Sequence, residues 1–184
     1  MNTFCTIITA SHIPYACALF ESLRKFDTDI SLNVLVVDQT EIQKRSTDGL
    51  LFHCLDAVAG SFDVGKRICE KYNKPDTQDE LRWSLKPVLV NYLFDQGYGK
   101  VNFTDPDTFY YSDFGFLFDE LDENDILLTP HWRGLDSNAD TVNFELQFVG
   151  GLFNGGFIEV NQNASAALNW WANSCLYRCE KSFS

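Results

Sequence analysis

Basic residues are scarce in this sequence, with 14 lysines and arginines against 26 aspartates and glutamates. The formal net charge is −12, and no basic stripe runs along the chain. Nucleic acids and anionic membrane surfaces are polyanions, which a net-acidic protein surface repels. We therefore expect no nucleic-acid partner.

Long apolar runs and paired cysteines are also absent. No stretch reaches 18 consecutive apolar residues, so we expect no transmembrane segment. Residues 1–6 carry no basic residue before their apolar run, and we expect no signal peptide. The six cysteines form no C-x-x-C pair, although Cys175 and Cys179 lie one helical turn apart. Reduced thiols in a cytoplasmic protein are therefore expected.

The residues that are present favour one α/β domain. The chain has 184 residues, 45% of them hydrophobic, which suffices for one sizeable core. Apolar and β-branched runs predict strands at residues 4–9 and 32–37. Between them, apolar residues recur at steps of three and four from Ala16 to Phe26, which predicts a helix with Pro14 in its first turn. A strand, a helix and a buried strand within 38 residues indicate a βαβ unit.

The rest of the chain alternates in a similar way. We expect further strands at residues 101–104, 125–129 and 157–160, and helices at residues 62–72, 113–121 and 164–179. A third strand at residues 50–55 and a helix at residues 142–149 are possible. Thr77 and Glu80 form a possible capping box, and Ser84 is a second possible cap for a helix that stops at Gly97. A start at Ser84 places Lys86 in the first turn, where it suits a phosphate. A surface lysine whose stem covers apolar neighbours is the alternative.

Two carboxylates follow the strand predicted at residues 101–104. Asp105 and Asp107 flank Pro106, which stops the strand. Side chains alternate along a strand, so aspartates at i and i+2 share a face and can reach one hard cation together. A polar turn after a strand is the alternative, because Asp and Pro are common turn residues.

A glycine-rich segment, Gly-Gly-Leu-Phe-Asn-Gly-Gly-Phe, occupies residues 150–157. It lacks the G-x-x-x-x-G-K-[ST] pattern of a phosphate-binding loop. Gly155 and Gly156 let backbone approach a ligand closely, and Asn154 offers both a donor and an acceptor, which suits sugar hydroxyls. A tight bend with Asn154 as its cap remains open.

Taken together, five segments resemble glycosyltransferases of the GT-A fold, in particular the bacterial and glycogenin-like enzymes with a metal-binding Asp-x-Asp motif. The resemblance is carried by Tyr15 after the first strand, Trp-Ser-Leu-Lys-Pro at 83–87, Asp105-Pro106-Asp107, Leu-Thr-Pro-His at 128–131, and Phe-Asn-Gly-Gly-Phe at 153–157 followed by Trp170-Trp171. Their order covers roughly residues 4–179. It implies a Rossmann-like nucleotide-diphospho-sugar transferase fold, with a mostly parallel central sheet flanked by helices.

The resemblance also implies the chemistry. Similar enzymes transfer a sugar from a nucleoside diphosphate-sugar, here expected to be a UDP-sugar, to a glycan, lipid or protein acceptor that the sequence does not identify. Asp105 and Asp107 would hold Mn²⁺ or Mg²⁺ and act in catalysis together with Lys86, which would contact the donor phosphate or sugar. A cation of this kind stabilises the negative diphosphate that leaves.

Other residues are expected around the donor. Tyr15 and Asp38, at the carboxyl ends of the first two strands, fall where a uracil ring and its ribose would lie. Asn154, Gly155 and Gly156 would line the donor-sugar pocket. The role of His131 is left open between a core position and a substrate contact.

The sequence departs from the family pattern beyond the Trp170-Trp171 helix. Similar enzymes continue with an Asp-Gln segment and, in glycogenin-like members, a metal-binding histidine. We therefore expect residues 1–184 to be a single nucleotide-sugar-binding domain that lacks the C-terminal part of a full enzyme, with weak or absent turnover.

Two other functions are open. One is a non-catalytic sugar-nucleotide-binding module. The other is a haloacid dehalogenase-like phosphatase, in which Asp105 of an Asp-x-Asp-x-Thr motif would be the nucleophile. That family usually starts with this motif, whereas here it lies past the middle of the chain.

Overall fold

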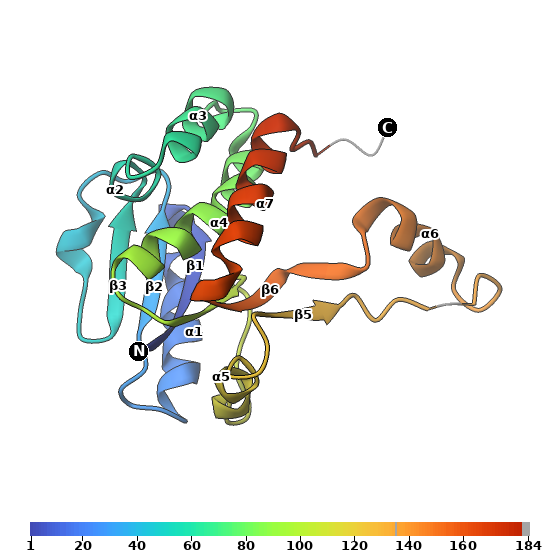
Figure 1. The fold of residues 1–184 in the computed structure, drawn as a ribbon, viewed down its shortest axis with the longest axis horizontal. Coiled ribbons are helices and arrows are strands. Elements are labelled where there is room, and N and C mark those ends of the chain that lie inside the picture. The colour runs from blue at the N-terminus through green and yellow to red at the C-terminus, as the bar shows by residue number, and fades with distance from the viewer. Residues whose placement is uncertain (135, 182–184) are drawn as a thin grey trace.

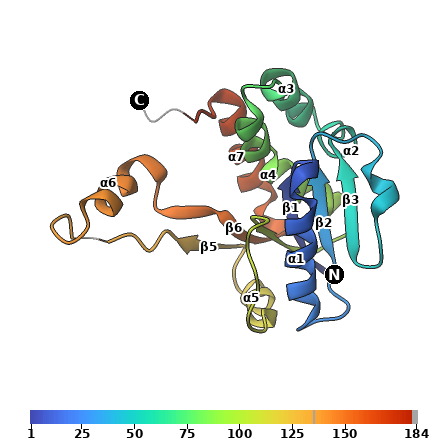
Figure 2. The same ribbon diagram turned by 180° about the vertical axis from the view of Figure 1, so that it is seen from behind.

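The computed structural model describes residues 1–134 and 136–181 of the chain. These residues form a six-stranded sheet with helices on both faces (Figures 1 and 2). The strands are β1 (Asn2–Ile8), β2 (Leu32–Val36), β3 (Leu50–Cys54), β4 (Lys100–Thr104), β5 (Ile126–Pro130) and β6 (Phe153–Asn161). The α-helices are α1 (Ile13–Arg24), α2 (Leu55–Ala59), α3 (Asp63–Tyr72), α4 (Gln78–Asp95), α5 (Gly115–Glu120), α6 (Thr141–Gly150) and α7 (Ser165–Tyr177). Short 3₁₀ turns cover Ala10–His12, Ile42–Arg45 and Gln162–Ala164.

The sheet has the strand order β3-β2-β1-β4-β6-β5. Strands β1 to β4 pair in parallel, whereas β6 runs antiparallel to both β4 and β5. Parallel neighbours need long crossovers, and α1 lies in the crossover between β1 and β2. The prediction of an α/β fold with a mostly parallel central sheet flanked by helices is confirmed.

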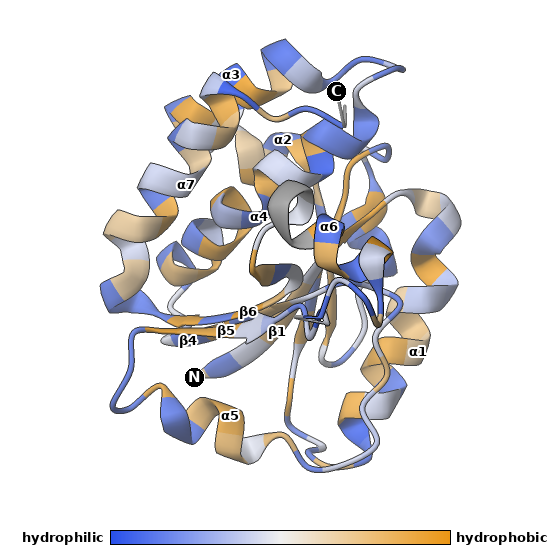
Figure 3. Ribbon diagram, turned by 90° about the vertical axis from the view of Figure 1, so that its right-hand side faces the viewer, coloured by the Kyte–Doolittle hydropathy of each residue, from blue (hydrophilic) through white to orange (hydrophobic). Residues whose placement is uncertain are grey.

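Each face of the sheet has its own hydrophobic core. Residues of α3, α4 and α7 pack on one face, and residues of α1 and α5 pack on the other (Figure 3). Alternate side chains of β1 enter the two cores: Cys5 and Ile7 face α4, and Phe4 and Ile8 lie with α1 and α5. Every residue of β2 is buried, which explains its nearly continuous apolar sequence.

Most predicted elements are present with shifted ends. The possible strand at residues 50–55 is β3, and the helices predicted at 62–72, 142–149 and 164–179 are α3, α6 and α7. The helix predicted at 113–121 is shorter, because α5 covers only Gly115–Glu120. The short helix α2 was not predicted. Within the described ranges, no helix is long and apolar enough to cross a membrane.

Helix α4 begins earlier than the sequence predicts. The helix begins at Gln78 with Thr77 at the N-cap, so Ser84 is an interior residue and not a cap. The predicted capping box is also wrong, because the Thr77 hydroxyl donates to the Tyr72 carbonyl oxygen at 2.7 Å and caps nothing. Lys86 consequently lies in the middle of α4, beyond the reach of the partial charges at the helix N-terminus.

Packing explains why α4 continues through Pro87. A proline inside a helix costs about 3 kcal/mol, because it lacks the N–H and crowds the preceding turn. Leu81, Leu85 and Leu89 are fully buried on either side of it. Each such side chain contributes about 1.5–3 kcal/mol on burial, which outweighs the cost.

The glycine-rich segment at residues 150–157 also differs from the prediction, because its second half belongs to a strand. β6 begins at Phe153, where it pairs with Pro130 of β5, and not at Phe157. Asn154, Gly155 and Gly156 therefore lie within a strand, and the tight bend is ruled out. The chain before β6 carries α6 away from the body of the molecule (Figures 1 and 2).

Candidate functional site

Asp105 and Asp107 lie just beyond β4. The Asp105 amide donates to the Gly156 carbonyl oxygen at 2.8 Å, which extends the pairing of β4 with β6 by one residue. Pro106 has no N–H and cannot continue this pairing, so the chain turns, and the Thr108 amide donates to the Asp105 carbonyl oxygen at 3.1 Å. The Asp105 side chain is 45% exposed and Asp107 is exposed, so both carboxylates remain accessible.

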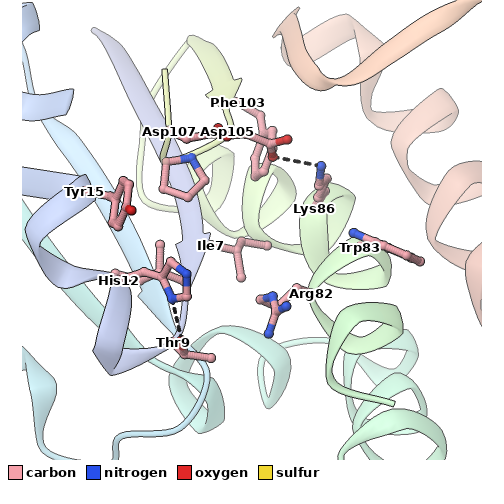
Figure 4. A pocket seen from close by; sticks show the side chains of 12 residues that line it. Ile7, Thr9, His12, Tyr15, Arg82, Trp83, Lys86, Phe103, Asp105 and Asp107 are labelled. Atoms are coloured by element: carbon pink, nitrogen blue, oxygen red, sulfur yellow. Dashed lines mark hydrogen bonds and ion pairs between the residues drawn. The ribbon is translucent and has the colours of Figure 1, made fainter. Parts of the chain in front are cut away.

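Lys86 meets Asp105 from the middle of α4. Its Nζ lies 3.1 Å from Asp105 Oδ1 (Figure 4). It also lies 2.8 Å from the Gly155 carbonyl oxygen. The same ammonium group is 4.7 Å from the centre of the Phe103 ring. Only 11% of the Lys86 side chain is exposed, so these partners replace the water that the charge has lost. Lys86 thereby fixes Asp105 between α4 and β6.

Gly156 leaves room for the Asp105 carboxylate. A Cβ atom at Gly156 would lie 2.4 Å from Asp105 Oδ2 and 2.9 Å from its Cγ. A Cβ at Gly155 would meet nothing within 4 Å. The Asn154 Oδ1 accepts a hydrogen bond from the Gly156 amide at 2.9 Å, so the side chain turns back onto its own strand. Position 156 therefore requires a glycine because the Asp105 side chain approaches it closely.

A cavity of about 330 Å³ brings four of the predicted site residues together. Tyr15, Lys86, Asp105 and Asp107 all line it, beside the carboxyl ends of β1 and β4 (Figure 4). This edge of an α/β sheet is where ligands commonly bind. Tyr15 is 51% exposed and its ring centre lies 5.6 Å from that of His12, which gives the cavity an aromatic wall.

The other predicted residues lie nearby but outside this cavity. Asp38 is exposed after β2, and its Oδ1 accepts a hydrogen bond from the Ala10 amide at 2.8 Å. Gly155 and Gly156 line an adjoining cavity of about 590 Å³, which shares Trp83 and Lys86 with the first. We call this second space the α4–α7 cavity.

His131 also lines the α4–α7 cavity, from the segment that follows β5. Its amide donates to the Leu152 carbonyl oxygen at 3.0 Å, which keeps this segment beside the start of β6. Its side chain lines the cavity, where a bound ligand can contact it.

Arg82 and His12 also line the first cavity, although neither is predicted as a site residue from the sequence. Arg82 precedes Lys86 by one helical turn and is paired with Asp79 on the same helix. Residues four apart share a helix face, so a correctly placed start of α4 would have put Arg82 beside Lys86. His12 is the N-cap residue of α1, but its side chain makes no capping hydrogen bond. Its Nδ1 lies 2.9 Å from the Thr9 hydroxyl instead.

Asp105 and Asp107 are the carboxylates available to a cation in this cavity. Across the part of the chain that the structure describes, no group of three or more His, Cys, Asp or Glu side chains could hold a metal ion. Carboxylate oxygens suit Mg²⁺ or Mn²⁺, and these ions retain water and bind substrate phosphates. The two residues therefore fit a cation that is shared with a bound diphosphate, not a site closed by protein ligands alone.

Comparison with known sequences gives one distant relative. No protein-family model matches the chain. The uncharacterized protein YfnF of Bacillus subtilis (strain 168) is 26% identical over 183 residues, which cover 97% of this chain. The chain spans 59% of the length of that relative.

Solved structures give the fold. Mouse xyloside xylosyltransferase 1, in its apo form, has a TM-score of 0.57 at 14% identity, covering 95% of this chain and 72% of that one. The galactosyltransferase LgtC, in complex with donor and acceptor sugar analogues, has a TM-score of 0.55 at 17% identity, covering 96% of this chain and 61% of that one. The chain therefore has the GT-A fold of these glycosyltransferases.

Proposed function

We propose that the chain is the donor-binding domain of a metal-dependent glycosyltransferase that uses a nucleoside diphosphate-sugar, specifically a UDP-sugar. The observation that carries this proposal is the single cavity lined by Tyr15, Lys86, Asp105 and Asp107, which come from α1, α4 and the end of β4. The Tyr15 ring suits a nucleobase. The two carboxylates, through a bound metal ion, and the Lys86 ammonium group suit a diphosphate. The GT-A fold supports the transfer chemistry.

The base and ribose are assigned to the end of the sheet formed by β1 and β2. Tyr15 and His12 offer exposed rings on which a uracil can stack. Asp38 would accept a hydrogen bond from a ribose hydroxyl while it keeps its bond to the Ala10 amide. Asn154, Gly155 and Gly156 would face the donor sugar from the α4–α7 cavity, the last two of them as lining residues.

The diphosphate is assigned to the other side of the first cavity. Asp107 makes no hydrogen bond or ion pair with any described residue, so it is free to hold Mn²⁺ or Mg²⁺ together with Asp105. Such an ion supplies positive charge for the diphosphate that leaves when the anomeric C–O bond breaks. Arg82, on the same wall, would add a guanidinium to the phosphate oxygens.

Lys86 acts in this proposal mainly by positioning. Its ammonium group already contacts Asp105 and the Gly155 carbonyl oxygen, so it holds the carboxylate and β6 in place before the donor arrives. Groups that are fixed before a reaction stabilise developing charge without the cost of reorganisation. Lys86 can also contact the donor, because it lines both cavities.

Calorimetric titration of UDP with and without Mn²⁺ tests the proposal. We expect binding that requires Mn²⁺ and is weakened at least about tenfold in Asp107→Ala, because a lost charged ligand costs more than about 1.4 kcal/mol. Asp119→Ala is the matched control, because Asp119 is an exposed carboxylate on α5 outside the cavity. Equal binding without metal, or no binding of any nucleoside diphosphate by folded protein, would contradict the proposal.

Neither the phosphatase nor the non-catalytic module is favoured, because the solved structures that share the fold are glycosyltransferases.

A further inference from the structure

Two cysteines meet where α7 ends. Cys175 lies in the last turn of α7, and Cys179 follows two residues after its end. The Tyr72 hydroxyl donates to the Cys175 carbonyl oxygen at 2.9 Å and accepts from the Cys179 amide at 3.0 Å. One side chain of α3 therefore holds the backbones of both cysteines together.

The backbone between the cysteines departs from a regular helix. Residues four apart in a helix have Cβ atoms about 5–6 Å apart, whereas a disulfide needs about 3.5–4.5 Å. Arg178, between them, is extended with φ −151° and ψ 118°, so Cys179 leaves the helical path. The two thiols nevertheless lie close enough to form a hydrogen bond with each other.

Both thiols are half-buried and line the α4–α7 cavity. A small reagent in this cavity can therefore reach them. By contrast, Cys5 is fully buried, and burial raises the pKa of the Cys69 thiol to about 11. All six cysteines are free in the structure.

The two thiols differ in acidity. A hydrogen bond with the Cys175 thiol lowers the pKa of Cys179, while burial and Glu80 oppose this and Lys71 adds to it. The same interaction, together with burial, raises the pKa of Cys175. Cys179 therefore provides the thiolate that begins an exchange reaction, and Cys175 provides the second thiol.

We propose that Cys175 and Cys179 are a reversible modification site, at which a small disulfide such as oxidised glutathione forms an intramolecular disulfide on the wall of the α4–α7 cavity. This proposal does not rest on the proposed transferase function. It also goes beyond the expectation of reduced thiols.

The reaction takes two exchange steps. The Cys179 thiolate attacks one sulfur of oxidised glutathione, forms a protein–glutathione disulfide and expels a glutathione thiolate, which takes a proton from water. Cys175 then loses its proton to solvent and attacks the Cys179 sulfur, which expels the second glutathione. Two protein thiols are oxidised, and one glutathione disulfide is reduced to two glutathione molecules.

Peptide mapping tests the proposal on the unmodified chain. Folded protein is treated with oxidised glutathione, its free thiols are blocked with N-ethylmaleimide, and it is digested with trypsin without reductant. Trypsin cleaves after Arg178 and separates the two cysteines. We expect the tripeptide Cys179-Glu180-Lys181 to be joined to the peptide that ends at Arg178, and dithiothreitol to release it.

Variants identify the order of the steps. Cys175→Ser should stop at a stable glutathione adduct on Cys179. Cys179→Ser should lose the cross-link and form its adduct more slowly than Cys175→Ser, because burial raises the pKa of the remaining Cys175 thiol. Cys69→Ser, which removes another half-buried thiol, should cross-link like the unmodified chain. A persistent adduct on the unmodified chain, a cross-link between other cysteines, or six unreacted thiols would each overturn the proposal.

Discussion

At the scale of single residues, the contact between Lys86 and Asp105 determines the shape of the candidate site. The ammonium group has little exposure and is balanced by one carboxylate and one carbonyl oxygen. Removing such a partner leaves a buried charge without compensation, which costs more than the pair itself contributes. The missing side chain of Gly156 is what allows Asp105 to remain in this position.

Gly156→Ala should therefore destabilise the protein. The added Cβ overlaps Asp105 and forces its carboxylate away from Lys86, so we expect the free energy of unfolding to fall by about 1–3 kcal/mol, as in other overpacked sites. Urea unfolding followed by circular dichroism measures this change.

Gly155→Ala is the control for that prediction, because its Cβ enters open space on the neighbouring residue of the same strand. We expect its free energy of unfolding to stay within about 0.5 kcal/mol of the original value. An equal loss in both variants would show that β6 tolerates no side chain here and that Asp105 is not the cause.

At the scale of elements, α4 connects the candidate site to the rest of the fold. α4 packs on the sheet and against both α3 and α7, and it carries Arg82 and Lys86 to the cavity wall. The end of α7 is in turn fastened to α3 through the Tyr72 hydroxyl. The wall of the α4–α7 cavity thus depends on contacts between three helices.

Tyr72→Phe removes the hydroxyl that joins α3 to the end of α7. We expect a loss of about 1–3 kcal/mol in the free energy of unfolding, because the Cys175 carbonyl and the Cys179 amide lose their shared partner in a partly buried position. Urea unfolding provides the measurement. Tyr177→Phe, at an 86% exposed residue of α7, should change nothing, and similar losses in both variants would refute the assignment.

At the scale of the whole molecule, a buried carboxyl group ties stability to pH. Glu159 of β6 is fully buried, and its Oε1 accepts a hydrogen bond from Asn102 of β4 at 2.8 Å. Its other carboxyl oxygen has no partner within the described residues. Burial raises the pKa of Glu159 from 4.5 to about 7, against the opposing effect of this hydrogen bond.

The sign of the effect follows from proton binding. Between pH 4.5 and 7 the folded protein holds a proton on Glu159 that the unfolded chain has released. The contribution to stability is therefore complete below about pH 4.5 and is lost as the pH rises through about 7. Glu159→Gln should weaken this pH dependence. The shift of the pKa corresponds to a change of up to about 3 kcal/mol in the free energy of unfolding between pH 4 and 8, which the variant should lose.

Urea unfolding of both proteins across this pH range checks the prediction. Glu120→Gln, which neutralises an exposed carboxylate on α5, should keep the pH dependence of the original chain. An unchanged pH dependence in Glu159→Gln would show that Glu159 does not titrate in this range.

The sequence by itself determined the order of the strands and of every helix except α2, and the strand end at Asp105-Pro106-Asp107. Apolar periodicity and proline act over a few residues, so these features do not depend on distant contacts. The resemblance carried by Tyr15, Lys86 and the two aspartates was enough to indicate the fold.

Only the tertiary structure decided how those residues meet. The start of α4 followed from burial of Leu81 and Leu85 and not from local capping, and this moved Lys86 away from the helix N-terminus. The contact of Lys86 with Gly155 joins residues that lie far apart in sequence. Such contacts depend on the packing of α4 against the sheet, a long-range balance of burial and charge that no local sequence pattern records.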